Sequence, residues 1–326
     1  MTEKQSLLLV DDEPTNLRVL RTVLQEQYRL LFAKSGEEAL QLVQKEQPDL
    51  ILLDVMMPGL TGFDVCARLK ANPATSAIPV IFVTALKDEM DETKGFEVGA
   101  VDYITKPISP AVVRARVKTH LSLVQAQELK QTRLQVIQRL GRAAEYKDNE
   151  TGLHVMRMSH YSQVLALAYG FSEQKAEDLL HTAPMHDIGK IGIADSILLK
   201  PGKLTAEEYK EMQKHPLIGA EIIGDCESDL LKMAKAVALY HHEKWDGTGY
   251  PYGLSAEQIP VEARIVALSD VFDALTSARP YKQAWSIEDT LQYMRAQKGL
   301  HFEPILVDLL EQNLQQILHI KQRWAE

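Results

Sequence analysis

Short apolar runs alternate with amphipathic stretches over the first third of the chain. Five runs rich in leucine or β-branched residues are expected to form strands: Leu7–Val10, Arg29–Ala33, Leu50–Asp54, Val80–Thr84 and Val101–Thr105. Between them, apolar residues recur at helical spacing, and this alternation is typical of a doubly wound parallel sheet covered by helices. The pattern therefore predicts an α/β domain with a five-stranded parallel sheet over residues 1–123.

A long helix is expected after the fifth run. Between Ser109 and Tyr146 there is no proline after Pro110 and no glycine before Gly141, and helix-forming residues dominate. Residues 124–140 are expected to connect two domains. The apolar positions of the helix form one interrupted stripe: Val113, Val117, Leu121, Val124, Leu129, Val136 and Leu140. This stripe fits either a parallel dimer through the helix or a helix whose halves pack separately on the two domains.

The remaining residues, 141–326, show apolar positions at helical spacing and no alternating strand pattern. Loops rich in glycine, proline and aspartate separate the helical stretches. We therefore expect an all-α domain here. A chain of 326 residues also exceeds the usual size of one hydrophobic core, which agrees with two domains.

Composition and charge exclude several classes of function. Apolar residues make up 45% of the chain and charged residues 25%, so disorder is excluded. The net charge of −9 argues against a nucleic-acid partner. Residues 1–6 do not resemble a signal peptide, and no run approaches the ~20 apolar residues that span a bilayer, so we expect a cytoplasmic protein without a membrane partner. Cys66 and Cys226 match no redox or metal spacing and are expected to be buried.

Polar residues stand at the carboxyl ends of the expected strands, where parallel sheets bind ligands. They are Asp11, Asp12, Asp54, Thr84 and Lys106. Three carboxylates at one edge repel one another unless a hard cation holds them, and Mg²⁺ prefers such oxygen ligands. Asp54 is then placed to accept a phosphoryl group. Helix caps and solvated loop carboxylates would explain only one or two of the five residues.

These positions resemble the response-regulator receiver family. The resemblance rests on Asp11-Asp12, Asp54 with Met57-Pro58-Gly59, Thr84-Ala85 and Lys106-Pro107. It implies that Asp54 is phosphorylated by a sensor histidine kinase. It also implies a Mg²⁺ site and a conformational switch, formed by Asp11, Asp12, the carbonyl of Met56, Thr84, Tyr103 and Lys106. Tyr103 is alternatively an aromatic residue at a strand edge.

Histidines and carboxylates gather in the helical domain in a pattern that suits a metal site. The candidate ligands are Glu150, His154, His186, Asp187, His215, His241, His242 and Asp270. Glu150 and His154 are four residues apart, so on a helix they share one face. Imidazole and carboxylate ligands without thiolates suit Fe, Mn, Ni or Zn rather than a structural zinc finger. A lone histidine is more often a core or surface residue, and this interpretation is kept for His120, His160, His181 and His319.

The helical domain resembles the HD-GYP branch of the HD metallohydrolases. The matching stretches include 150–157, 186–192, 200–205, 241–251, 270–276 and 279–282. The resemblance implies that all the candidate ligands except Glu150 bind two divalent ions, that Asp187 bridges these ions, and that Glu150 supports a third. Ala194 and Glu303 depart from the usual family residues and coincide with no proposed ligand.

The resemblance implies hydrolysis of cyclic di-GMP to pGpG, GMP or both. Lys190 is the candidate for stabilising charge on phosphorus or protonating the leaving oxygen. Candidate substrate-binding residues are Arg157, Gly249, Tyr250, Asp273, Arg279 and Lys282. Arg157 is alternatively a residue that orients Glu150, and the glycines of 246–251 alternatively form a tight turn. Two other functions stay open: a signalling scaffold that binds partner proteins, and hydrolysis of another cyclic dinucleotide.

Overall fold

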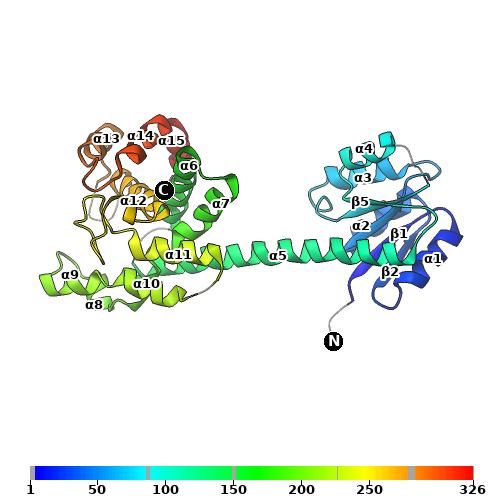
Figure 1. Ribbon diagram of the computed structural model, residues 1–326, viewed down its shortest axis with the longest axis horizontal. Helices are drawn as coiled ribbons and strands as arrows, with labels where there is room; N and C mark the ends of the chain where they lie inside the picture. Colours follow the sequence, from blue (N-terminus) through cyan, green and yellow to red (C-terminus); the bar gives the residue numbers. More distant parts are fainter. Residues whose placement is uncertain (1–3, 86–88, 149–151, 226, 278–282, 326) are drawn as a thin grey trace. The chain divides into compact units, whose positions relative to one another are not determined.

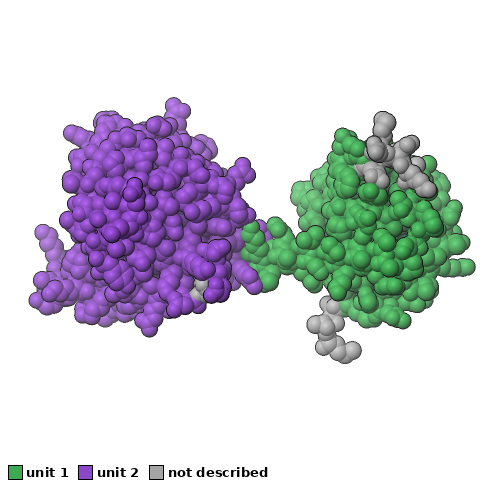
Figure 2. Space-filling view, viewed as in Figure 1, with its two compact units in different colours: residues 1–130 green, residues 131–326 purple. Residues whose placement is uncertain are grey.

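The computed structural model describes residues 4–85, 89–148, 152–225, 227–277 and 283–325. The chain divides into two compact units, Met1–Lys130 and Gln131–Glu326 (Figure 2). Helix α5 (Pro110–Lys147) is a single helix, as expected, and the boundary between the units falls inside it. Among the described helices, none combines the length and the apolar character needed to cross a membrane.

The first unit contains the expected five-stranded parallel sheet (Figure 1). Its strands are β1 (Ser6–Val10), β2 (Arg29–Ala33), β3 (Leu50–Asp54), β4 (Val80–Thr84) and β5 (Asp102–Thr105). They are arranged in the order β2-β1-β3-β4-β5, and all neighbouring pairs are parallel. Three of the strands have the predicted bounds, and the other two differ by one residue. The fold class of this unit is therefore confirmed.

Helices cover both faces of this sheet, which explains why its central strands are apolar throughout. The helices are α1 (Pro14–Leu24), α2 (Gly36–Glu46), α3 (Gly62–Ala71), α4 (Glu89–Glu97) and the first part of α5. Leu8 and Val10 of β1 belong to the same core as buried residues of α2 and α3, including Cys66. Leu7 and Leu9 belong to a second core with residues of α1 and α5. Cys66 is buried as expected, and Cys226 lies outside the described residues.

The second unit is helical in its described residues, as predicted. Its α-helices after α5 are α6 (Gly152–Tyr169), α7 (Glu173–Thr182), α8 (Asp195–Leu198), α9 (Ala206–Met212), α10 (His215–Ile223), α11 (Asp229–Tyr240), α12 (Val261–Thr276), α13 (Ile287–Ala296), α14 (Pro304–Gln312) and α15 (Leu314–Arg323). The described part of this unit also contains three short 3₁₀ helices: η1 (Ala183–Met185), η2 (Ile188–Gly192) and η3 (Ala256–Gln258). The largest core packs α6 against α12, with Tyr161 and Phe272 in edge-to-face contact.

Helix α5 uses different faces in its two halves. In the first unit, Val113, Val117 and Leu121 are buried against the sheet. In the second unit, Ile137 and Ala144 are buried against Met185 and Ile188, close to the candidate ligands His186 and Asp187. These contacts support separate packing of the two halves. However, Leu129, Val136 and Leu140 remain about half exposed, so part of the predicted stripe is still available for another contact.

Candidate metal centres

The strand-end carboxylates of the first unit lie together. Asp11, Asp12 and Asp54 each offer an oxygen, and these atoms lie within 4.8 Å of one another. The Lys106 ammonium donates to Asp11 Oδ2 at 2.9 Å and to Asp54 Oδ2 at 2.8 Å. Burial raises the pKa of Asp54, while the hydrogen bond and charge of Lys106 act in the opposite direction. The donor set consists of oxygen atoms from acids, so it fits a hard divalent cation such as Mg²⁺.

The two expected switch residues, Thr84 and Tyr103, lie on strands β4 and β5. Thr84 is buried at the end of β4, while Tyr103 of β5 is partly buried and packs against the core that contains Phe82. The Tyr103 ring also lies 5.6 Å from the Arg116 guanidinium carbon. The Met56 amide donates to Asp54 Oδ1 at 3.3 Å. The predicted switch residues Thr84 and Tyr103 thus lie on β4 and β5, and their switching role stays a prediction.

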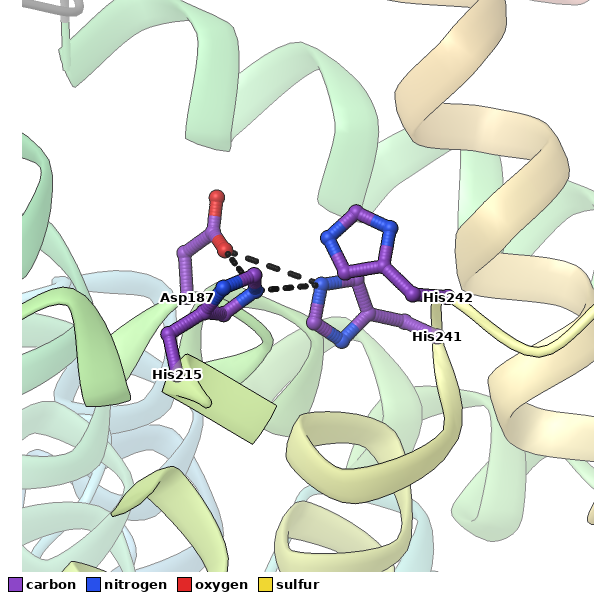
Figure 3. Close-up of side chains that lie close together, drawn as sticks. All are labelled: Asp187, His215, His241 and His242. Atoms are coloured by element: carbon purple, nitrogen blue, oxygen red, sulfur yellow. Dashed lines mark hydrogen bonds and ion pairs between the residues drawn. The ribbon is translucent and has the colours of Figure 1, made fainter. Parts of the chain in front are cut away.

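Five elements of the second unit contribute the described candidate ligands. His154 is on α6, His186 and Asp187 lie between η1 and η2, His215 begins α10, His241 and His242 follow α11, and Asp270 is on α12. The ligand atoms form two groups in which all separations are below 4.8 Å. One group contains Asp187, His215, His241 and His242 (Figure 3), and the other contains His154, His186 and Asp270.

Asp187 links the two groups through its two oxygen atoms. Oδ1 lies 3.2 Å from His215 Nε2 and 3.6 Å from His241 Nε2, both of the first group. Oδ2 lies 3.2 Å from His186 Nε2, which belongs to the second group. A carboxylate with one oxygen facing each group has the geometry that a bridging ligand needs. This arrangement supports the expectation that Asp187 contacts two ions.

The hydrogen bonds of the imidazole rings test whether cations fit this site. His186 Nδ1 lies 3.0 Å from the Ala183 carbonyl oxygen, and His215 Nδ1 lies 2.8 Å from that of Met212. A carbonyl oxygen only accepts, so each Nδ1 carries the proton and the Nε2 of the neutral ring presents a lone pair. His241 Nδ1 likewise faces two backbone carbonyls at 3.1 Å.

Several lone pairs therefore converge on one point. His215 Nε2 and His241 Nε2 lie 3.5 Å apart, and both face the Asp187 carboxylate. Three acceptors this close repel one another unless a cation lies between them. The donation of the second ring nitrogen to a backbone carbonyl is also typical of metal-ligating histidines. The residues present thus fit divalent metal ions.

Electrostatics favours the metal-binding protonation states of His241, His242, Asp187 and Asp270, whereas Asp270 and Asp273 outweigh burial and raise the pKa of His154. Burial lowers the pKa of both His241 and His242, which keeps these rings neutral. Burial alone would raise the pKa of Asp187, but the charge of Lys190 and the contact with His186 lower it well below its usual range. The pKa of Asp270 is also lowered, because the effect of its hydrogen bond with His154 is larger than the effect of burial. Neutral imidazoles and ionised carboxylates are the ligand forms that divalent ions require.

Arg157 and Asp273 are placed differently from the expectation that they bind substrate. Arg157 donates to Asp273 through Nε at 2.7 Å and through Nη2 at 2.8 Å, and both side chains are buried. Asp273 Oδ2 also lies 2.9 Å from His154 Nδ1. The pair thus supports His154 from behind, as an outer carboxylate supports a metal-ligating histidine. These contacts favour a supporting role for the pair, and substrate binding by Arg157 and Asp273 stays a prediction.

Gly249 and Tyr250 pack directly against the histidine doublet. A Cβ atom at Gly249 would lie 2.4 Å from the Lys244 nitrogen, so the glycine is needed for close backbone packing. The Tyr250 ring stacks on His242, with ring centroids 4.7 Å apart. Glu243 is buried and accepts from the amides of Tyr252 and Leu254, which fixes this loop. These contacts favour the tight-turn alternative for residues 246–251. Glu243 directly follows the doublet within the matching stretch 241–251, and the sequence pattern assigns it no role of its own.

Lys190 lies beside the bridging candidate. Its ammonium contacts Asp187 Oδ2 at 2.7 Å and also forms an ion pair with Asp148. Its side chain is mostly buried, with 13% exposed. The candidates Glu150, Arg279 and Lys282 lie outside the described residues.

Gly189 allows the two ligand-bearing segments to approach each other. A Cβ atom there would lie 1.8 Å from the His215 carbonyl oxygen and 2.5 Å from the Gly219 nitrogen. We expect Gly189→Ala to lower the free energy of unfolding by about 1–3 kcal/mol, because backbone must move to admit the methyl group. It should also reduce bound metal by displacing His215 from Asp187.

The matched control is Gly192→Ala in the same segment, where the nearest atoms belong to the movable Ile218 side chain. Denaturant unfolding and metal analysis of both variants are the measurements. If Gly189→Ala has wild-type stability and metal content, the close packing of Gly189 against the backbone of His215 is not needed for the fold or for metal binding.

Comparison with known proteins gives matches to both units. The family model for the HD domain matches residues 122–306, and that for the response regulator receiver domain matches residues 7–118. A probable cyclic di-GMP phosphodiesterase of Vibrio cholerae is 39% identical, over 98% of this chain and 80% of that protein. A cyclic di-GMP phosphodiesterase response regulator of Xanthomonas campestris pv. campestris is 39% identical, over 94% of this chain and 86% of the relative. A 3′3′-cGAMP-specific phosphodiesterase of V. cholerae is 44% identical, over 60% of this chain and 37% of the relative.

Proposed function

Because the chain belongs to the HD-domain family and carries a response-regulator receiver domain ahead of it, we propose that it is a response regulator that hydrolyses cyclic di-GMP. The similarity to two cyclic di-GMP phosphodiesterases along nearly the whole chain supports a phosphodiesterase. The structural observation that carries the proposal is the position of Asp187 between two groups of metal-ligating side chains. The products proposed are pGpG, GMP or both.

Divalent ions held by these residues would supply Lewis acidity toward a phosphodiester and a water molecule acidified for attack on phosphorus. The chain itself orients the ligands: the Arg157–Asp273 pair fixes His154, and backbone carbonyls fix His186 and His215. Lys190 keeps a positive charge beside Asp187, where charge develops on the phosphoryl oxygens or the leaving group. The ions would be Fe, Mn, Ni or Zn, since the ligands are imidazoles and carboxylates.

The number of bound ions is a separate prediction. The two described groups are expected to hold two ions, and Glu150, four residues before His154 in the sequence, is expected to hold a third. Glu150→Ala should therefore lower the metal content from three ions to two per chain. Element analysis and anomalous scattering count them. A fully loaded wild-type protein with two ions would show that Glu150 does not bind metal.

The substrate is tested with a panel of cyclic dinucleotides assayed with Mn²⁺ and Fe²⁺. Cyclic di-GMP is expected to be hydrolysed fastest. A second candidate substrate is 3′3′-cGAMP, which is favoured by the 44% identity to a phosphodiesterase named for that nucleotide. Faster turnover of 3′3′-cGAMP would replace the proposed substrate. If no member of the panel is hydrolysed by metal-loaded protein, the remaining function is a signalling scaffold that binds partner proteins.

Phosphorylation of Asp54 by a sensor histidine kinase is proposed to control hydrolysis. The phosphoryl group is expected to draw in Thr84 and reorient Tyr103, and this change acts on α5, which begins five residues after β5. Typical allosteric coupling of ~1–3 kcal/mol corresponds to a roughly 5- to 150-fold change in an equilibrium. We therefore expect beryllofluoride to increase the initial rate within that range.

The control for this response is Asp54→Asn, which should not respond to beryllofluoride. An insertion of two residues near Gln131, within α5, should also abolish the response while leaving the basal activity measurable. Equal rates with and without beryllofluoride in the wild type would exclude the coupling. A response that survives the insertion would exclude α5 as its route.

A homodimer through α5 is also proposed. Leu129, Val136 and Leu140 are 49–51% exposed and follow seven- and four-residue spacings, which are typical of a parallel coiled coil. The short stripe makes the dimer dependent on concentration.

A further inference from the structure

The end of helix α5 contacts the segment that carries the candidate metal ligands and Lys190. The Lys147 ammonium donates to the carbonyl oxygens of Ile191 and Ile193, each at 2.7 Å, and lies 3.4 Å from that of Lys190. These carbonyls belong to η2 or follow it directly. An ammonium group at the carboxyl end of a helix satisfies carbonyls that have no partner within the helix.

The next residue, Asp148, contacts the side chain of the same segment. Its carboxylate forms an ion pair with the Lys190 ammonium, and its side chain is 18% exposed. Lys190 also contacts Asp187 Oδ2. Among the described residues, Asp148 is thus a carboxylate outside the ligand set that holds Lys190 in place. Two consecutive residues at the end of α5 therefore contact the segment 190–193: Lys147 binds its backbone carbonyls, and Asp148 binds the Lys190 side chain.

The C-terminal part of α5 packs closely against the segment that carries His186 and Asp187. A Cβ atom at Gly141 would lie 2.5 Å from both the Cβ and the carbonyl oxygen of Pro184, so the helix lies directly against η1. Ile137 and Ala144, one turn to either side, are buried against Met185 and Ile188. The helix is thus fixed on both sides of His186 and Asp187, and its last turn cannot shift without moving the segment.

From these contacts we propose that Lys147 and Asp148 are positioning residues: they act through η2 and Lys190 and set where the Lys190 ammonium stands relative to Asp187. This inference rests on the proposed phosphodiesterase function. It adds two residues outside the metal-ligand set, and it identifies the last turn of α5 as the part of that helix on which turnover depends.

The test compares Lys147→Met and Asp148→Asn with wild type in the full-length, metal-loaded protein. Both variants are expected to lower kcat by roughly 10- to 100-fold, as loss of an outer supporting contact does. KM and bound metal should change less than about twofold, because neither residue is a ligand. Lys147→Arg should recover part of kcat, since a guanidinium also donates to carbonyls. The matched control is Lys298→Met, a lysine of similar exposure that pairs with Asp308.

A double-mutant cycle separates positioning from a general loss of structure. In a Lys190→Met background, Asp148→Asn is expected to cause little further loss of kcat, because its effect passes through Lys190. Additive losses would overturn the proposal, and so would wild-type kcat in both single variants. Amide hydrogen exchange adds a readout without substrate: the amides of Lys190 and Ile193, bonded within this segment, should exchange faster in Lys147→Met. Unchanged exchange there would remove Lys147 from the proposal.

If wild-type protein hydrolyses no cyclic dinucleotide, the proposed function fails first. The same variants are then compared with bis(p-nitrophenyl) phosphate as a generic phosphodiester. An unaltered kcat in Asp148→Asn on that substrate would overturn the positioning role independently.

Discussion

Asp187→Ala is expected to abolish hydrolysis and to lower the metal content of the second unit. Asp187 is the one described side chain with an oxygen facing each ligand group, so its removal leaves both groups without a shared anion. The histidines left behind present lone pairs to one another, and His215 Nε2 lies only 3.5 Å from His241 Nε2. Removal of the metal also removes the acidified water, so the rate should fall to the background of the assay.

The matched variants for this prediction are His186→Ala, His242→Ala and Asp225→Ala. The two histidine variants each remove a ligand from one group and should also abolish activity, with partial loss of metal. Asp225 is a carboxylate of the same unit whose side chain is 99% exposed, and its replacement should change neither quantity. Hydrolysis at the wild-type rate by Asp187→Ala would remove the residue from the proposed site.

Lys190→Met is expected to lower kcat by roughly 10²-fold or more while the bound metal is retained. The side chain contributes positive charge beside Asp187 without being a ligand, so its loss affects the reaction more than the site. Although the charge of Lys190 lowers the pKa of Asp187, bound cations would keep that carboxylate ionised in the variant.

The control is Lys232→Met, a lysine that forms an ion pair with Asp229 at the same three-residue spacing but on the surface. Kinetics and element analysis on the same samples separate turnover from metal content. Full activity in Lys190→Met would exclude its catalytic role, whereas loss of metal would assign Lys190 a role in assembling the site.

Much of the fold follows from local sequence patterns. The central strands of the first unit are apolar throughout because helices cover both faces, and this continuous pattern marks them clearly. The two faces of α5 were harder to predict. The sequence showed the stripe with Leu129, Val136 and Leu140, whereas Leu134 and Ile137, which pack in the second unit, lie on a different face. Which stripe is buried depends on contacts distant in sequence.

The candidate ligands could be found from the sequence because histidines next to carboxylates are unusual in a helical domain. The residues that contact and orient these ligands could not be found in the same way, because their partners are distant in the sequence. Asp273 lies three residues after Asp270, and the sequence pattern does not indicate its contacts with Arg157, 116 residues away, and with His154. Lys147 likewise contacts backbone carbonyls more than 40 residues away, and no local pattern indicates such a partner.

The most direct test of the central claim is the rate at which linear pGpG or GMP forms from cyclic di-GMP. Full-length protein is loaded with Mn²⁺ or Fe²⁺, and one portion is then treated with a chelator and reloaded. Rapid product formation is expected with either metal, loss of the activity after chelation, and its return on reloading. Protein with its full metal content that forms no linear product, or whose activity persists after complete removal of metal, would contradict a metal-dependent cyclic di-GMP phosphodiesterase.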